Sequence, residues 1–92
     1  MFNAEYAEMY ADMKVGSRVV LDTRLETNMG DMHVTFERGD EGTIVCTHED
    51  NADLEAGHRL WLVEFFRTPR PGSKDHYTYK LWFRAHKLGL IA

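Results

Sequence analysis

Residues 34–45, which read Val-Thr-Phe-Glu-Arg-Gly-Asp-Glu-Gly-Thr-Ile-Val, place the strongest constraint on how this chain can fold. Apolar and polar residues alternate on both sides of a charged centre, which is typical of two half-buried β-strands joined by a turn. Gly39 and Gly42 lie in that centre, and glycine can take positive φ without steric cost. The stretch therefore predicts a chain reversal at one corner of a small β-fold.

The length of 92 residues predicts one domain with one compact core. No run of residues approaches the roughly 18 apolar positions of a membrane span, and the acidic N-terminus does not resemble a secretory signal. Cys46 is the only cysteine, so an internal disulfide is impossible and a reducing compartment is expected. We therefore expect a cytoplasmic protein without a membrane segment.

The N-terminal residues predict a short amphipathic helix that ends before Gly16. Asn3 is a suitable N-cap, and acidic residues favour the first turns of a helix. Two interpretations of its apolar stripe stay open. The helix either covers the open end of a barrel or presents the stripe to a partner. The stripe residues proposed for partner binding are Tyr6, Met9, Tyr10 and Met13.

Short β-prone runs separated by turn residues predict the remaining elements. The most apolar run, residues 59–66, predicts a central strand or a strand with one face covered by the helix. The two prolines of residues 68–73 predict an exposed hairpin loop. Residues 49–57 predict an acidic loop, and residues 84–87 one helical turn. The other predicted strands are residues 18–21, 32–36, 43–48, 77–83 and 88–91, and a turn is predicted at 28–31 within the polar segment 22–31.

These elements predict a mainly β fold, a small five-stranded antiparallel barrel over residues 15–92 with an N-terminal α-helix over residues 1–14. The order Gly-x-x-Val-Val, then Gly-x-x-Gly-x-Ile-Val, a hydrophobic strand and a turn before Leu-x-Leu-Ile resembles Src-homology-3-like barrels. Residues 39–45 resemble the second half of a KOW motif. The layout of residues 16–91 is similar to the variable chain of ferredoxin–thioredoxin reductase. These resemblances imply a fold and transfer no functional residue.

Two groups of residues have side chains of the types that bind metals or act as nucleophiles. His48, His58 and the acidic residues between them match no established metal spacing, so a solvated acidic loop is favoured and no metal or cofactor is expected. Alternation places Ile44 and Cys46 on one strand face, with His48 two residues further, so a buried and inert thiol is expected. No catalytic residue is predicted, and the chain is not expected to be an enzyme.

The distribution of charge suggests two kinds of partner. The chain carries a net charge of −4, with −9 over residues 1–58 and +5 over residues 59–92. An acidic face could bind or inhibit a protein partner, and this is the favoured function. Its proposed residues are Glu37, Asp40, Glu41, Asp50, Asp53 and Glu55.

The alternative function is nucleic-acid binding, because the C-terminal third interleaves cations with aromatic residues. A third interpretation is a small accessory subunit of an enzyme, which the reductase resemblance implies. The residues proposed for nucleic-acid binding are Arg67, Arg70, Lys74, Lys80 and Arg84.

Overall fold

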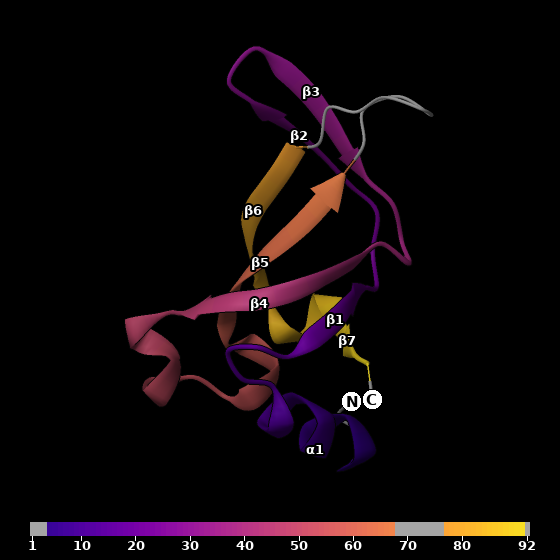
Figure 1. Ribbon diagram of the computed structural model, residues 1–92. Helices are drawn as coiled ribbons and strands as arrows, with labels where there is room; N and C mark the ends of the chain where they lie inside the picture. The colour runs from indigo at the N-terminus through magenta and orange to yellow at the C-terminus, as the bar shows by residue number, and fades with distance from the viewer. Residues whose placement is uncertain (1–3, 68–76, 92) are drawn as a thin grey trace.

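The computed structural model describes residues 4–67 and 77–91 and has a mainly β fold with one α-helix (Figure 1). The helix α1 covers Ala4–Asp12. The strands are β1 (Arg18–Leu21), β2 (Leu25–Met29), β3 (Met32–Phe36), β4 (Glu41–Thr47), β5 (Leu60–Arg67), β6 (Tyr77–Arg84) and β7 (Leu88–Leu90). Three 3₁₀ turns complete the described chain: η1 (Glu49–Asp53), η2 (Ala56–His58) and η3 (Ala85–Lys87).

Five strands form one antiparallel sheet in the order β6-β5-β4-β1-β7. The predicted central strand is confirmed, because β5 pairs with β4 on one side and with β6 on the other. The edge strands β6 and β7 are not paired with each other in the described residues, so the sheet is not closed into a barrel. The predicted loop at residues 68–73 lies outside the described residues.

The strands β2 and β3 form a separate hairpin, which lies at the opposite end of the molecule from α1 (Figure 1). The predicted turn is confirmed at Gly30, which has φ 64°. The sequence did not predict β2, because residues after Leu25 are polar and give no apolar alternation. Backbone pairing with β3 from Leu25–Phe36 to Met29–Met32 holds this segment as a strand.

The two glycines of residues 34–45 have different roles. Gly39 turns the chain with φ 99°, and the carboxylate of Asp40 accepts a hydrogen bond from the backbone N–H of Glu37 at 2.9 Å. Gly42 instead lies within β4, is buried and does not adopt positive φ. A β-carbon at Gly42 would lie 2.6 Å from Val63 Cγ1 and 2.9 Å from the backbone oxygen of Glu64. Gly42 therefore permits the close approach of β5 and takes no part in the turn.

The core lies between the main sheet, the base of the hairpin and α1. Phe36 of β3 packs on Phe65 of β5 with ring centroids 4.9 Å apart, and its edge meets Tyr79 at 6.0 Å. Phe65 also packs on Phe83 of β6 at 5.8 Å. These aromatic contacts fix the hairpin base to the main sheet. The other fully buried large side chains are Leu21, Ile44, Leu88, Val19 and Val63.

A β-bulge in β4 corrects the predicted position of Cys46. The register with β5 shifts between Ile44, which faces Val63, and Cys46, which faces Leu62. The extra residue moves Cys46 off the face of Ile44, because a bulge changes the alternation of side chains. Ile44 is fully buried whereas Cys46 is exposed, so the expectation of a buried thiol was wrong.

We predict that Gly42→Ala lowers the free energy of unfolding by about 1–3 kcal/mol, because the added methyl group forces β5 away from β4. Urea unfolding followed by circular dichroism measures this change. Gly89→Ala is the matched control, since a β-carbon at Gly89 meets mainly the side-chain atom Val20 Cγ1, at 3.1 Å. A smaller loss for Gly42→Ala than for Gly89→Ala would contradict the role of Gly42.

Candidate functional site

The six residues proposed for an acidic face form two separate groups. Glu37 and Asp40 lie at the turn before β4 and Glu41 is its first residue. Asp50, Asp53 and Glu55 lie beyond its other end, in and after η1. The seven residues of β4 span roughly 20 Å, which separates the groups. Figure 1 shows η1 and the β3–β4 turn at opposite ends of β4. The two acidic groups therefore lie at different ends of β4.

The acidic residues at the β3–β4 turn already have partners within the chain. Arg24 Nε lies 3.4 Å from Glu37 Oε1, and Arg18 Nη2 lies 3.4 Å from Glu41 Oε2. These exposed pairs contribute little to stability, but they neutralise part of the local negative charge. The remaining acidic positions at η1 are exposed.

The stripe of α1 is used in packing where the structure describes it. Tyr10 and Met13 are buried in the core, and Met9 packs partly against it. The side chain of Tyr6 lies outside the described residues. The helix packs on η2 and β7, so burial supports the interpretation that α1 covers one end of the sheet. The buried members Tyr10 and Met13 are not available to a partner.

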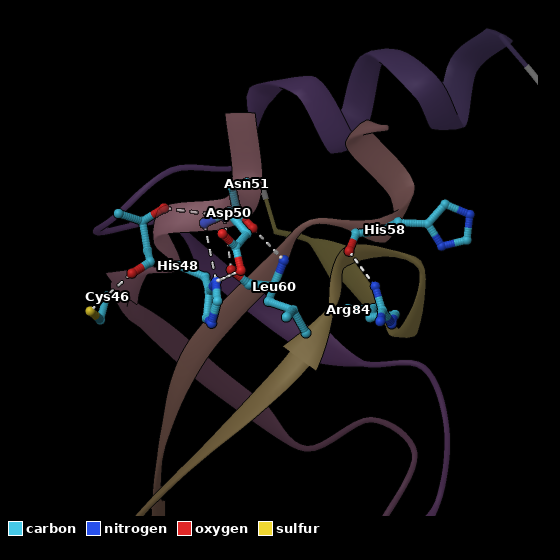
Figure 2. A network of polar contacts seen from close by, with 8 residues as sticks. Cys46, His48, Asp50, Asn51, His58, Leu60 and Arg84 are labelled. Carbon is cyan, nitrogen blue, oxygen red and sulfur yellow. Dashed lines mark hydrogen bonds and ion pairs between the residues drawn. The ribbon is translucent and has the colours of Figure 1, made fainter. Parts of the chain in front are cut away.

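The predicted nucleic-acid-binding residues are described only in part. Arg70, Lys74 and the side chain of Arg67 lie outside the described residues. Lys80 is exposed, with Nζ 3.8 Å from Glu64 Oε2. Arg84 is also exposed, and its Nη1 donates to the backbone oxygen of His58 at 2.9 Å (Figure 2). Of the five proposed cations, Arg84 alone is found beside a pocket in the described chain.

The pocket has a volume of about 390 Å³ and lies beside the last residues of β6. One wall is formed by β6 and η3, and the other by the segment that leads from β1 into β2. Trp82 is 45% exposed, whereas its neighbour Phe83 is buried in the core. The lining residues are Thr23, Arg24, Leu25, Trp82, Phe83, Arg84 and Lys87.

A backbone hydrogen bond joins the two chain segments that line this pocket. The N–H of Asp22 donates to the backbone oxygen of Lys87 at 2.8 Å, directly after the last β1–β7 pair, Leu21–Leu88. Residues 23–25 follow Asp22 and line the pocket from one side of this bond. Residues 82–84, which precede Lys87 in the chain, line it from the other segment. Two segments far apart in the sequence are thus joined at one point and form the pocket beyond it.

The pocket is lined by three cations and by no acidic side chain. Arg24 is paired with Glu26, at 2.8 Å between Nη2 and Oε1, and with Glu37. The charge of Glu26, followed by the hydrogen bond and charge of Glu37, raises the pKa of Arg24, which stays charged. Among the described residues, no carboxylate forms an ion pair with Arg84 or Lys87. The site is therefore suited to an anionic group beside an apolar one.

A pair of histidine rings lies next to the residues that line the pocket. His86 of η3 meets His58 of η2 edge to face, with ring centroids 5.5 Å apart. Burial lowers the pKa of His86, and the neighbouring charges of Lys87, His58 and Arg84 lower it further. Uncharged His86 is therefore the favoured state beside Lys87 at neutral pH.

Sequence reasoning found Arg84 but not the pocket. The signal for Trp82 was present, because three apolar residues in a row, Leu81 to Phe83, cannot all face the same side of a strand. Phe83 is buried and Trp82 points to the exposed face. The contribution of residues 23–25 had no local signal, since it depends on the path of the chain after β1.

A polar network fixes the connection between β4 and β5 (Figure 2). The buried Asn51 of η1 donates through Nδ2 to Thr47 Oγ1 at 3.1 Å and to the backbone oxygen of Leu60 at 2.9 Å. Its Oδ1 accepts from the N–H of Leu60 at 2.8 Å. These three hydrogen bonds of Asn51 hold the predicted acidic loop, which forms two 3₁₀ turns, against the start of β5.

The residues considered for chemistry do not converge. Cys46 Sγ donates to the backbone oxygen of Thr47 at 3.3 Å, while His48 Nδ1 accepts from the N–H of Asp50 at 3.2 Å. The ring of His48 instead meets Trp82 edge to face at 5.4 Å. Within residues 4–67 and 77–91, no three His, Cys, Asp or Glu side chains are grouped so as to hold a metal ion.

The same described residues contain no helix that is long and apolar enough to cross a membrane.

Comparison of the chain with protein-family models, curated proteins and solved structures gave no match. The interpretation of the pocket therefore depends on its geometry and chemistry.

We predict that Asn51→Ala lowers the free energy of unfolding by about 1–3 kcal/mol, because it leaves the backbone groups of Leu60 without their partner. Asp53→Ala is the control, because Asp53 is an exposed residue of the same 3₁₀ turn. Its free energy of unfolding is expected to stay within about 0.5 kcal/mol of that of the unchanged protein. Urea unfolding of both variants measures the contribution of the hydrogen bonds between Asn51 and Leu60. Equal effects of the two substitutions would show that Asn51 does not hold β5.

We also predict that stability falls as the pH drops below the ordinary histidine pKa of about 6.5. The pKa of His86 is lower in the folded chain than in the unfolded chain, so the unfolded state binds more protons in that range. This contribution is fully present above pH 6.5 and is lost as the pH falls through the folded pKa. Urea unfolding at several pH values should give a shallower dependence for His86→Gln. An unchanged slope would contradict the assignment to His86.

Proposed function

We propose that this protein is a non-catalytic, cytoplasmic interaction module that binds a protein partner at the pocket beside β6. The observation that carries the proposal is the half-exposed Trp82 in a pocket lined by Arg24, Arg84 and Lys87. Tryptophan and arginine are the residues most often responsible for binding energy at protein interfaces. The divided acidic groups give weaker support for a surface at residues 37–55.

We extend the proposal to the fold and suggest a Src-homology-3-like barrel. The five strands of the main sheet and the 3₁₀ turn before β7 fall on the segments that carry the sequence resemblance. The bond between Asp22 and Lys87 supports this layout, because it holds the chain after β1 next to the turn after β6.

Nucleic-acid binding is the second candidate function, and the combination of Trp82 with nearby cations favours it. A base could stack on the exposed indole ring while Arg84 and Lys87 contact phosphate. The net charge of −4 and the carboxylates of Glu26 and Glu37 beside Arg24 oppose the approach of a long polyanion. For this reason a protein partner ranks first.

A tagged pull-down from native lysate, run with and without nuclease, tests the proposed function. We expect a defined protein band that survives nuclease and is reduced at least about tenfold by Trp82→Ala, because truncation of a central aromatic residue commonly costs 2 kcal/mol or more. Val15→Ala is the matched control, since Val15 is 53% exposed and lies outside the lining of the pocket.

Three results would contradict this assignment. A band insensitive to Trp82→Ala would place the partner elsewhere. A band that is lost when Asp50, Asp53 and Glu55 are changed to Lys, but is kept in Trp82→Ala, would show that the partner binds the acidic residues and not the pocket. Recovery of nucleic acid, with every protein band lost on digestion, would establish the second candidate.

A further inference from the structure

We propose that the occupant of the pocket is an extended, carboxylate-bearing segment of the partner, which adds as a strand to the outer edge of β6 at residues 82–84. This inference rests on the proposed function and names its ligand. It follows from three properties of the pocket: the way it meets the backbone, the position of its cations and the exposure of Trp82.

The lining of the pocket shows that it meets β6 at the strand edge. Successive side chains of a strand point to opposite faces, and here Phe83 is buried while Trp82 is exposed. A pocket bordered by Trp82, Phe83 and Arg84 together touches residues of both faces, which fits a position along the free edge of the last residues of the strand. The opposite edge of β6 is paired with β5 along its whole length.

An edge strand presents backbone N–H and C=O groups that a further strand can pair with. β6 is the terminal strand of the main sheet in the described chain. Such a site selects a polypeptide, because its hydrogen bonds match the repeat of another backbone. A nucleic acid offers no equivalent pattern.

Three cations line the pocket, and the backbone oxygen of one of them, Lys87, accepts the hydrogen bond from the N–H of Asp22. Arg84 and Lys87 have no carboxylate partner among the described residues, whereas Arg24 already contacts Glu26 and Glu37. Two available positive charges match one or two carboxylates. The carboxylates beside Arg24 would repel additional negative charge, which limits the ligand to a short acidic segment.

Trp82 supplies the apolar part of the site. One edge contact to His48 orients its ring, and 45% of the residue remains exposed. An added strand would place every second side chain on the face that carries Trp82. An apolar residue of the segment can pack on the indole ring from that position.

A library of random twelve-residue peptides displayed on phage tests the inference. The library is selected on the full chain and depleted on the Lys87→Glu variant. We expect the recovered peptides to be rich in Asp and Glu at alternate positions. Recovery of peptides without acidic residues, or of no peptide at all, would overturn the proposal.

The strongest recovered peptide is then synthesised with and without N-methyl groups on alternate backbone nitrogens, and its affinity is measured by isothermal titration calorimetry. We expect N-methylation and Lys87→Glu each to weaken binding about tenfold, since each removes a hydrogen bond or charge contact. Lys14→Glu is the matched control, because it makes the same change in charge at an exposed position outside the pocket. Equal binding of the N-methylated peptide would exclude strand addition.

An oligonucleotide of twelve thymidines is measured in parallel. Oligonucleotide binding that depends on Lys87, without binding of acidic peptides, would assign the pocket to nucleic acid and overturn the inference. Failure of the peptide experiments, together with a Trp82-dependent band in the pull-down, would reject the acidic segment but keep the proposed function. Loss of both would reject the site itself.

Discussion

The close approach of β4 and β5 at Gly42 is the constraint on which the rest of this structure depends. The absence of a side chain at Gly42 lets Val63 and Phe65 pack directly against β4. Phe65 then lies in position to contact Phe36 and Phe83. Through these rings, one permissive position determines where the hairpin base and β6 lie. Because β4 also pairs with β1, both halves of the main sheet are positioned from the same strand.

Much of the fold followed from local pattern. The alternation in residues 32–36, the dense apolar run at residues 59–66 and the turn residues at Gly30 and Gly39 predicted elements that the structure contains. The errors had identifiable physical causes. Polar residues after Leu25 form a strand because the backbone pairs with β3, and backbone pairing leaves no mark on the pattern of side chains. Cys46 is exposed because a bulge inserts one residue, which simple alternation does not anticipate.

The candidate site was less predictable than the fold. A sequence shows which charges the chain has but not which of them come together, so the acidic residues from Glu37 to Glu55 were grouped although β4 separates them. The pocket requires contact between residues 23–25 and residues near 82–87, and this contact depends on tertiary structure alone. The apolar triplet ending at Phe83 was the one local indication, because a residue within it had to face outward.

The two walls of the pocket belong to parts of the molecule that are otherwise only partly connected. One wall is the main sheet, and the other leads into the β2–β3 hairpin, which packs on the sheet through its base, with Phe36 and Val34 in the core. A hairpin attached in this way can open locally while the main sheet stays folded. A ligand bound to both walls would join these two cooperative units, and amide hydrogen exchange in the hairpin would then slow to the rate set by opening of the main sheet.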